Sequence, residues 1–194
     1  MNDFSFYFGI GWHHIISWNA LDHILFIIAL VAIYLIPNWK QVLILVTAFT
    51  IGHSFTLALS VLDIIRFNEK WVEFLIPCTI LVTGAFNLRV KALQSASLKL
   101  NYFAALIFGF IHGMGFANTI RFILAGDQHI TIPLLGFNLG LEAGQVLLVT
   151  IILFISYIVV TKAGLNRKWW IWALSSVAIL TALVMALNRL PMIK

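Results

Sequence analysis

Charged residues are scarce in this chain of 194 residues, of which only 10% are Asp, Glu, Lys or Arg. Soluble globular proteins carry roughly 25%, so the sequence lacks the charge that an ordinary soluble surface needs. In contrast, 62% of the residues are apolar and the mean hydropathy is +1.02. Because apolar runs approach the length of about 20 residues that crosses a bilayer, the sequence predicts an all-α membrane protein. We expect residues 1–194 to form a single polytopic membrane domain.

Cysteine is almost absent, since Cys78 is the only one. A single cysteine excludes an internal disulfide and a metal cluster held by several thiolates. The twelve Lys and Arg residues contribute to a net charge of +5, but they are scattered between apolar runs and form no basic stripe. This distribution excludes a nucleic-acid partner, and we expect the lipid bilayer to surround the chain instead.

Six apolar segments run along the chain, each bounded by charged residues, Pro, Asn or paired Trp. Amphipathic Trp rings favour the headgroup level of a membrane, so the Trp residues at these boundaries are expected to be anchors. The pattern predicts a bundle of about six transmembrane helices with short connectors. The expected spans are roughly 12–36, 41–62, 71–88, 98–122, 132–161 and 170–188.

The connectors carry unequal positive charge. The first, third and fifth hold seven Lys and Arg residues, and the opposite side holds five. Because cytoplasmic connectors carry the excess of Lys and Arg, both termini are expected outside the cytoplasm. The first group is Lys40, Arg89, Lys91, Lys99, Lys162, Arg167 and Lys168, and the second is Arg66, Lys70, Arg121, Arg189 and Lys194.

Five ionisable side chains fall well inside the expected spans, away from their ends: Asp22, His23, His53, His112 and Glu142. An ionisable group at bilayer depth costs at least about 2.5 to 3.5 kcal/mol, which makes each one a functional candidate. Successive spans cross in opposite directions and each helical residue advances about 1.5 Å, so all five are expected in one layer roughly 15 Å deep. Imidazole nitrogen suits nickel, cobalt, zinc or copper, and carboxylates balance the charge. The sequence therefore predicts a divalent metal site near the midplane.

Polar neighbours extend this prediction. Several recur at helical spacing beside His53 and Glu142 and are expected to support the site, whereas Glu73 lies near the outer end of its span and is expected at an entrance. Glycines at four-residue spacing predict close contacts between helices. The supporting residues are Thr50, Ser54, Asn138 and Gln145, and the glycines are Gly109, Gly113, Gly136, Gly140 and Gly144.

Five motifs in this chain, in order, resemble those of the HupE/UreJ family of bacterial membrane proteins. They are His14 to His23, Phe49 to Leu57, Val72 to Phe74, Phe110 to Phe116, and Phe137 to Gln145. The resemblance covers nearly all of the chain. In the family, a glycine commonly stands two residues before the Asp-His pair. This chain has Ala20 at that position, which indicates a divergent branch whose cargo need not be nickel.

The resemblance implies a secondary permease for nickel or cobalt in the bacterial inner membrane. Because the family is associated with hydrogenase and urease gene clusters, it also implies a metalloenzyme maturation system as partner. Carried over by position, the metal route falls on His14, Asp22, His23, His53, Glu73, His112 and Glu142.

Two other functions fit the same residues. A catalytic zinc with a bound water would make the chain an intramembrane hydrolase, with Glu142 or Asp22 as general base, and a permanently held metal would make it a membrane subunit of a partner complex. The buried polar residues could also serve only to pack the helices together. The chain has no H-E-x-x-H motif, which favours transport over hydrolysis. The metal, the energy source and the oligomeric state stay open.

Overall fold

The computed structural model describes residues 3–89, 98–124 and 130–190, and within these ranges the chain is helical with no β-strand. Two basic residues used for the expected orientation, Lys91 and Lys194, lie outside the described residues. Two short 3-10 turns precede α2 and α3, and a π-helical segment, Tyr157–Lys162, continues α6. The helices are α1 (Asp3–Ile16), α2 (Leu21–Val31), α3 (Trp39–Val61), α4 (Glu69–Arg89), α5 (Leu98–Leu124), α6 (Thr131–Ser156) and α7 (Arg167–Asn188).

The predicted all-α membrane bundle is confirmed. Among the described residues, five helices are long and apolar enough to cross a membrane, and α1 with α2 forms a bent pair that makes a sixth if it is counted as one span. The sequence predicted one span over 12–36, but the apolar segment there begins earlier and is broken. The bend between α1 and α2 is 67°.

The break follows from the backbone at Ser17, which is extended with φ −72° and ψ 151° and so ends α1. Ser and Asn favour caps and turns over helix interiors because their side chains compete for backbone hydrogen bonds. Averaged hydropathy hides such a break, because the residues on both sides of Ser17-Trp18-Asn19 are apolar. The indole of Trp18 is 88% exposed, so the break reaches the surface of the bundle.

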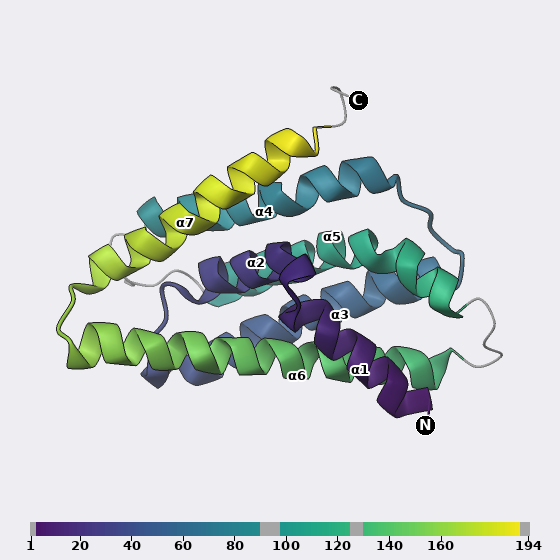
Figure 1. The fold of residues 1–194 in the computed structure, drawn as a ribbon, viewed down its shortest axis with the longest axis horizontal. Coiled ribbons are helices and arrows are strands. Elements are labelled where there is room, and N and C mark those ends of the chain that lie inside the picture. The colour runs from purple at the N-terminus through teal and green to yellow at the C-terminus, as the bar shows by residue number, and fades with distance from the viewer. Residues whose placement is uncertain (1–2, 90–97, 125–129, 191–194) are drawn as a thin grey trace.

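The helices pack mainly in pairs: α3 with α5, α1 with α6, and α4 with α7. Figure 1 shows α4 and α7 along one side of the bundle and α6 along the other, with α3 and α5 between them. The short helix α2 contacts α4, α6 and α7. The helix that follows the break is therefore packed against helices from the middle and the end of the chain.

Glycine sets the close approach of α3 and α5. A Cβ at Gly109 would meet the carbonyl oxygen of Phe49, and a Cβ at Gly113 would meet the backbone of His53. The glycine row of α6 has the same function against α1, where a Cβ at Gly140 would meet the backbone of Phe8. Small residues permit such backbone contacts between membrane helices. The contact between α3 and α5 brings the helix that carries His53 against the helix that carries His112.

Candidate metal centre

The broken first span directs two helix ends at the middle of the bundle. The last turn of α1 holds His14, and the first turn of α2 holds Asp22. The backbone N–H of His23 donates to Asp22 Oδ1 over 2.9 Å, as expected for a carboxylate at a helix N-terminus. The C-terminal end of α1 carries the opposite partial charge and favours a cation. The break therefore places both a carboxylate and a cation-favouring helix end beside the buried histidines.

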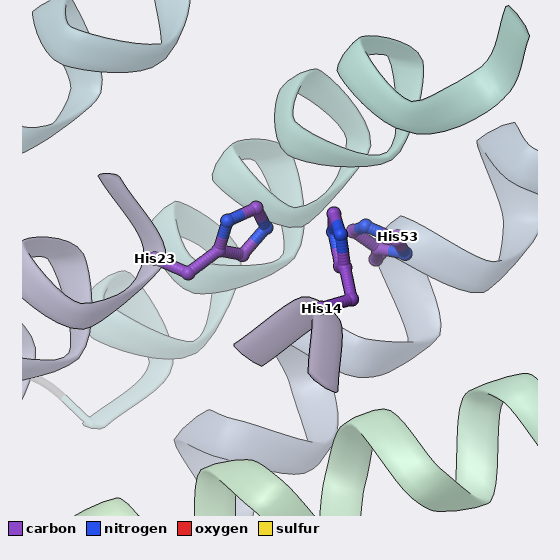
Figure 2. Close-up of side chains that lie close together, drawn as sticks. All are labelled: His14, His23 and His53. Carbon is purple, nitrogen blue, oxygen red and sulfur yellow. The ribbon is translucent and has the colours of Figure 1, made fainter. Parts of the chain in front are cut away.

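Three histidines from three helices meet at this break (Figure 2). One ring nitrogen from each of His14, His23 and His53 lies within 4.8 Å of the others. The ring of His23 points toward the rings of the other two, and its centroid is 4.6 Å from that of His14. At metal–nitrogen distances of about 2.1 Å, nitrogens around a tetrahedral ion are about 3.4 Å apart. Small side-chain rotations would thus bring all three nitrogens onto one cation.

The tautomer of His23 is set by Asp22. His23 Nδ1 lies 3.0 Å from Asp22 Oδ1, and an ionised carboxylate can only accept, so Nδ1 carries the proton and donates it. The lone pair is then on Nε2, which is buried and has no hydrogen-bond partner. A carboxylate that orients a histidine in this way is common beside metal ions, because it fixes the ring and makes it more basic.

The tautomer of His112 follows from Thr79. The Thr79 hydroxyl donates to the carbonyl oxygen of Ile76 over 2.7 Å and also lies 3.0 Å from His112 Nε2. A hydroxyl has one proton to donate, so Nε2–H of His112 is the donor to Thr79. The lone pair of His112 is on Nδ1, which is buried and unpartnered. The ring centroid lies 5.1 Å from that of His23, so His112 lies beside the three converging histidines without being one of them.

These four histidines form what we call the imidazole cluster, and their free nitrogens are its most informative feature. A buried polar atom left without a partner costs about 1–3 kcal/mol, and several in one place indicate that something else satisfies them. A divalent cation would accept all the lone pairs together. The unpartnered buried nitrogens are His14 Nε2, His23 Nε2, His53 Nδ1, His53 Nε2 and His112 Nδ1.

Aromatic rings enclose the imidazole cluster. Phe137 stacks on His53 with the ring centroids 6.2 Å apart, and Phe116 lies 4.1 Å from His14. Phe26 and Phe49 stack on each other at 4.8 Å and both lie 5.1 Å from His112. Such rings exclude water, and low polarity strengthens the attraction between a cation and the Asp22 carboxylate.

A cavity of about 280 Å³ leads to the cluster and is lined by His14, Asp22, His23 and His112. The exposed Glu73 of α4 also lines it, at the end of α4 where the sequence predicts an entrance. Arg189 lines the cavity as well, and sequence reasoning assigned it only to membrane topology. Its Nη1 lies 3.5 Å from Asp22 Oδ2 and donates to the carbonyl oxygen of Glu73 over 3.3 Å. No pattern in the sequence links Arg189 to Asp22, because only the packing of α7 against α2 and α4 brings them together.

The structure does not bring Glu142 to the histidines. Glu142 lines a separate groove between α3 and α6, and this groove shares no residue with the cavity at the imidazole cluster. Its Oε1 accepts a 2.9 Å hydrogen bond from the Thr47 hydroxyl. Phe137 of α6 faces His53, and Glu142 follows five residues later, about 140° further around the helix. Phe137 and Glu142 therefore lie on different faces of α6, and Glu142 points away from His53 even though the sequence predicts a similar depth for the two.

The predicted supporting residues lie with Glu142, beside a face of α3 that adjoins the face carrying His53. Ser54 and Asn138 line the same groove, and the Thr50 hydroxyl donates to Gln145 Oε1 over 2.8 Å. Since all of these side chains offer oxygen, we call the group the oxygen cluster: Thr47, Thr50, Ser54, Asn138, Glu142 and Gln145.

Comparison with known proteins gives one match. The family model described as HupE / UreJ protein matches residues 1–189 of this chain. No curated protein and no solved structure matches it significantly. The match extends across every described helix up to Asn188 and includes both clusters.

Proposed function

Because the chain belongs to the HupE / UreJ family, which is associated with nickel and cobalt transport, we propose that it is a membrane permease for a divalent transition-metal cation. One observation carries the proposal: nitrogens of His14, His23 and His53 lie within 4.8 Å of one another at a break in a membrane span. Broken helices with ion sites at the break are typical of secondary transporters. The cation is the substrate of the protein, held only in passage.

The donor set favours a particular class of substrate. Three imidazole nitrogens, with His112 as a fourth, suit nickel, cobalt, zinc or copper better than magnesium or calcium, which prefer oxygen. Asp22 supplies negative charge and keeps the lone pair of His23 Nε2 free for the cation. Nickel or cobalt is the substrate that the family favours.

The route into the site begins at Glu73, whose carboxylate attracts cations to the cavity. The cation then reaches Asp22 and the imidazole cluster. On the opposite side, the stacked rings of Phe26 and Phe49 close the path. Transport requires these rings to part while the Glu73 side closes, and the break at Ser17 allows α1 and α2 to tilt separately. In this proposal the protein lies in a bacterial inner membrane with both termini outside the cytoplasm, so the Glu73 side faces outward.

Uptake by liposomes tests the proposal. Purified protein in liposomes should take up radiolabelled nickel or cobalt, and His53→Asn should reduce both uptake and equilibrium binding at least about 100-fold, since it removes a direct ligand. The matched control is His13→Ala, because His13 is exposed and is not among the three converging histidines. Folded protein that carries neither metal would overturn the proposal. If that protein held one tightly bound zinc per chain, the hydrolase or the metal-holding subunit would take its place.

A further inference from the structure

The oxygen cluster has a chemistry of its own that metal transport through the histidines leaves unused. It lies between α3 and α6 and is held by two hydrogen bonds, Thr47 to Glu142 and Thr50 to Gln145. In both bonds the threonine donates its proton, which leaves lone pairs on the hydroxyl oxygen. Asn138 Oδ1 is buried and has no hydrogen-bond partner. The groove therefore contains several oxygens with spare accepting capacity.

The donors in this groove are those of a hard cation. Among the described residues that line it, the polar groups are hydroxyls, an amide and one carboxylate, with no His, Cys, Lys or Arg. Hard cations prefer carboxylate, carbonyl and hydroxyl oxygen, whereas nickel and cobalt favour nitrogen. This groove is thus suited to a different ion from the one expected at the imidazole cluster.

The charge of the groove favours a monovalent over a divalent cation. Of the described residues that line the groove, only Glu142 is ionisable, and a carboxylate without a counter-charge is unfavourable in a membrane-spanning segment. A monovalent cation would neutralise it completely, whereas a divalent cation would leave one uncompensated positive charge. Low polarity around the groove makes that difference large.

The two clusters are joined by neighbouring residues on two helices. On α3, His53 belongs to the imidazole cluster and the next residue, Ser54, lines the oxygen groove. On α6, Phe137 stacks on His53 and the next residue, Asn138, lines the groove. A movement of either helix therefore changes both clusters together.

From these observations we propose that the oxygen cluster binds one Na⁺ ion, and that this ion drives metal movement through the shared parts of α3 and α6. The Na⁺ site is argued only from the donor atoms and the charge of the groove. The coupling of Na⁺ to metal movement, in contrast, rests on the proposed function. Bound Na⁺ would take Glu142, the unpartnered Asn138 oxygen and the hydroxyls as ligands.

Equilibrium binding of radiolabelled Na⁺ to the purified protein, at fixed pH with choline as the replacing cation, tests the site. We expect saturable binding, and a loss of affinity of at least about tenfold in Glu142→Gln and in Thr47→Val. Thr150→Val is the matched control, because its hydroxyl bonds only its own helix at the carbonyl of Val146. Thermal unfolding shows whether each variant is folded. Absence of saturable binding to folded wild type, or unchanged binding in both variants, overturns the site.

Nickel uptake by liposomes tests the coupling. An inward Na⁺ gradient should raise uptake several-fold over equal Na⁺ on both sides, and Glu142→Gln should remove this dependence. Nickel uptake that is independent of the Na⁺ gradient, or that depends only on a pH gradient, overturns the coupling. Saturable Na⁺ binding by protein that takes up no nickel would overturn the proposed function and the coupling, while supporting the Na⁺ site.

Discussion

The imidazole cluster and the oxygen cluster share α3 but have no type of donor atom in common. In the imidazole cluster His53 and His112 have 0% exposure, and one ring nitrogen from each of His14, His23 and His53 lies within 4.8 Å of the others. The oxygen cluster lies in an open groove, where Thr47 is exposed and Glu142 is half-buried. The face of a helix that a residue occupies thus decides which ion it can serve, even between residues at a similar depth.

If both proposals hold, this small membrane protein separates two ions without separate domains. One face of α3 presents imidazole and the adjoining face presents hydroxyls. Nitrogen donors disfavour alkali cations, and a single carboxylate with neutral oxygens disfavours divalent transition metals. When the two ions are measured separately, a change of donor in either region should therefore leave the affinity for the other ion unchanged.

The largest expected effect comes from Gly109→Ala. The added Cβ would meet the carbonyl oxygen and the Cα of Phe49, and backbone atoms cannot rotate away. Forcing α3 from α5 should lower the free energy of unfolding by about 3 kcal/mol and weaken nickel binding at His53 and His112. Thermal unfolding and nickel titration measure both effects. The control is Gly9→Ala, where an added Cβ meets no atom within 4 Å; equal losses in both variants would contradict the prediction.

The next effect is expected from Thr79→Val, which removes the hydroxyl that accepts from His112 Nε2. Without this partner the His112 tautomer is no longer fixed, and nickel affinity should fall about 10- to 100-fold, as is typical when a group supporting a metal ligand is lost. Na⁺ binding should not change. Thr83→Val, one turn along α4, serves as control because that hydroxyl bonds the carbonyl oxygen of Thr79. Unchanged nickel affinity in Thr79→Val would mean that His112 takes no part.

A smaller effect of opposite sign is expected from Arg189→Gln. The guanidinium lies 3.5 Å from Asp22 Oδ2 and repels an incoming cation, but it is partly exposed and screened by solvent. Nickel affinity should therefore rise only about two- to fivefold, and added salt should reduce the difference from wild type. Nickel titration at two salt concentrations measures this. Arg66→Gln, at an exposed ion pair with Asp63, should change nothing, and a fall in nickel affinity in Arg189→Gln would show that the arginine supports the site.

The smallest effect is expected at Asp63, which follows α3 and lines neither the cavity at the imidazole cluster nor the groove at the oxygen cluster. Hydrogen bonds from Arg66, with the nearby charge of Arg121, lower the pKa of Asp63 from 3.8 to about 2. A lowered pKa stabilises the folded protein above pH 3.8 and loses that contribution as the pH falls toward about 2. In Asp63→Asn the thermal stability should therefore fall less steeply as the pH is lowered, and the affinities for both ions should be unchanged. An identical pH profile in the variant would contradict this.

Much of the fold follows from apolar length alone. A run that needs about 20 residues to cross the membrane has few alternatives to a helix, because lipid offers no partners for backbone groups. The glycines at four-residue spacing also predicted helix contacts, and Gly109 and Gly140 do lie against neighbouring backbones. The break at Ser17 was missed because an average over a long window ignores one extended residue.

The residues that make up the candidate metal site are harder to predict from the sequence than the fold. Counting residues from a membrane face estimates depth, so Asp22, His53 and Glu142 looked equivalent. The count gives no information on rotation about the helix axis, and that rotation separates Glu142 from His53. Arg189 was missed for a related reason, since only the packing of α7 places it beside Asp22.

The broken first span also constrains how the protein is made. Helices of 14 and 11 residues rise about 1.5 Å per residue, so neither alone is as long as the roughly 30 Å hydrocarbon layer is thick. α1 packs chiefly on α6, which leaves the ribosome more than a hundred residues later. We therefore expect α1 to reach its final position only after most of the chain has been synthesised. His14, which it carries as a proposed metal ligand, should therefore join His53 only in a nearly finished protein.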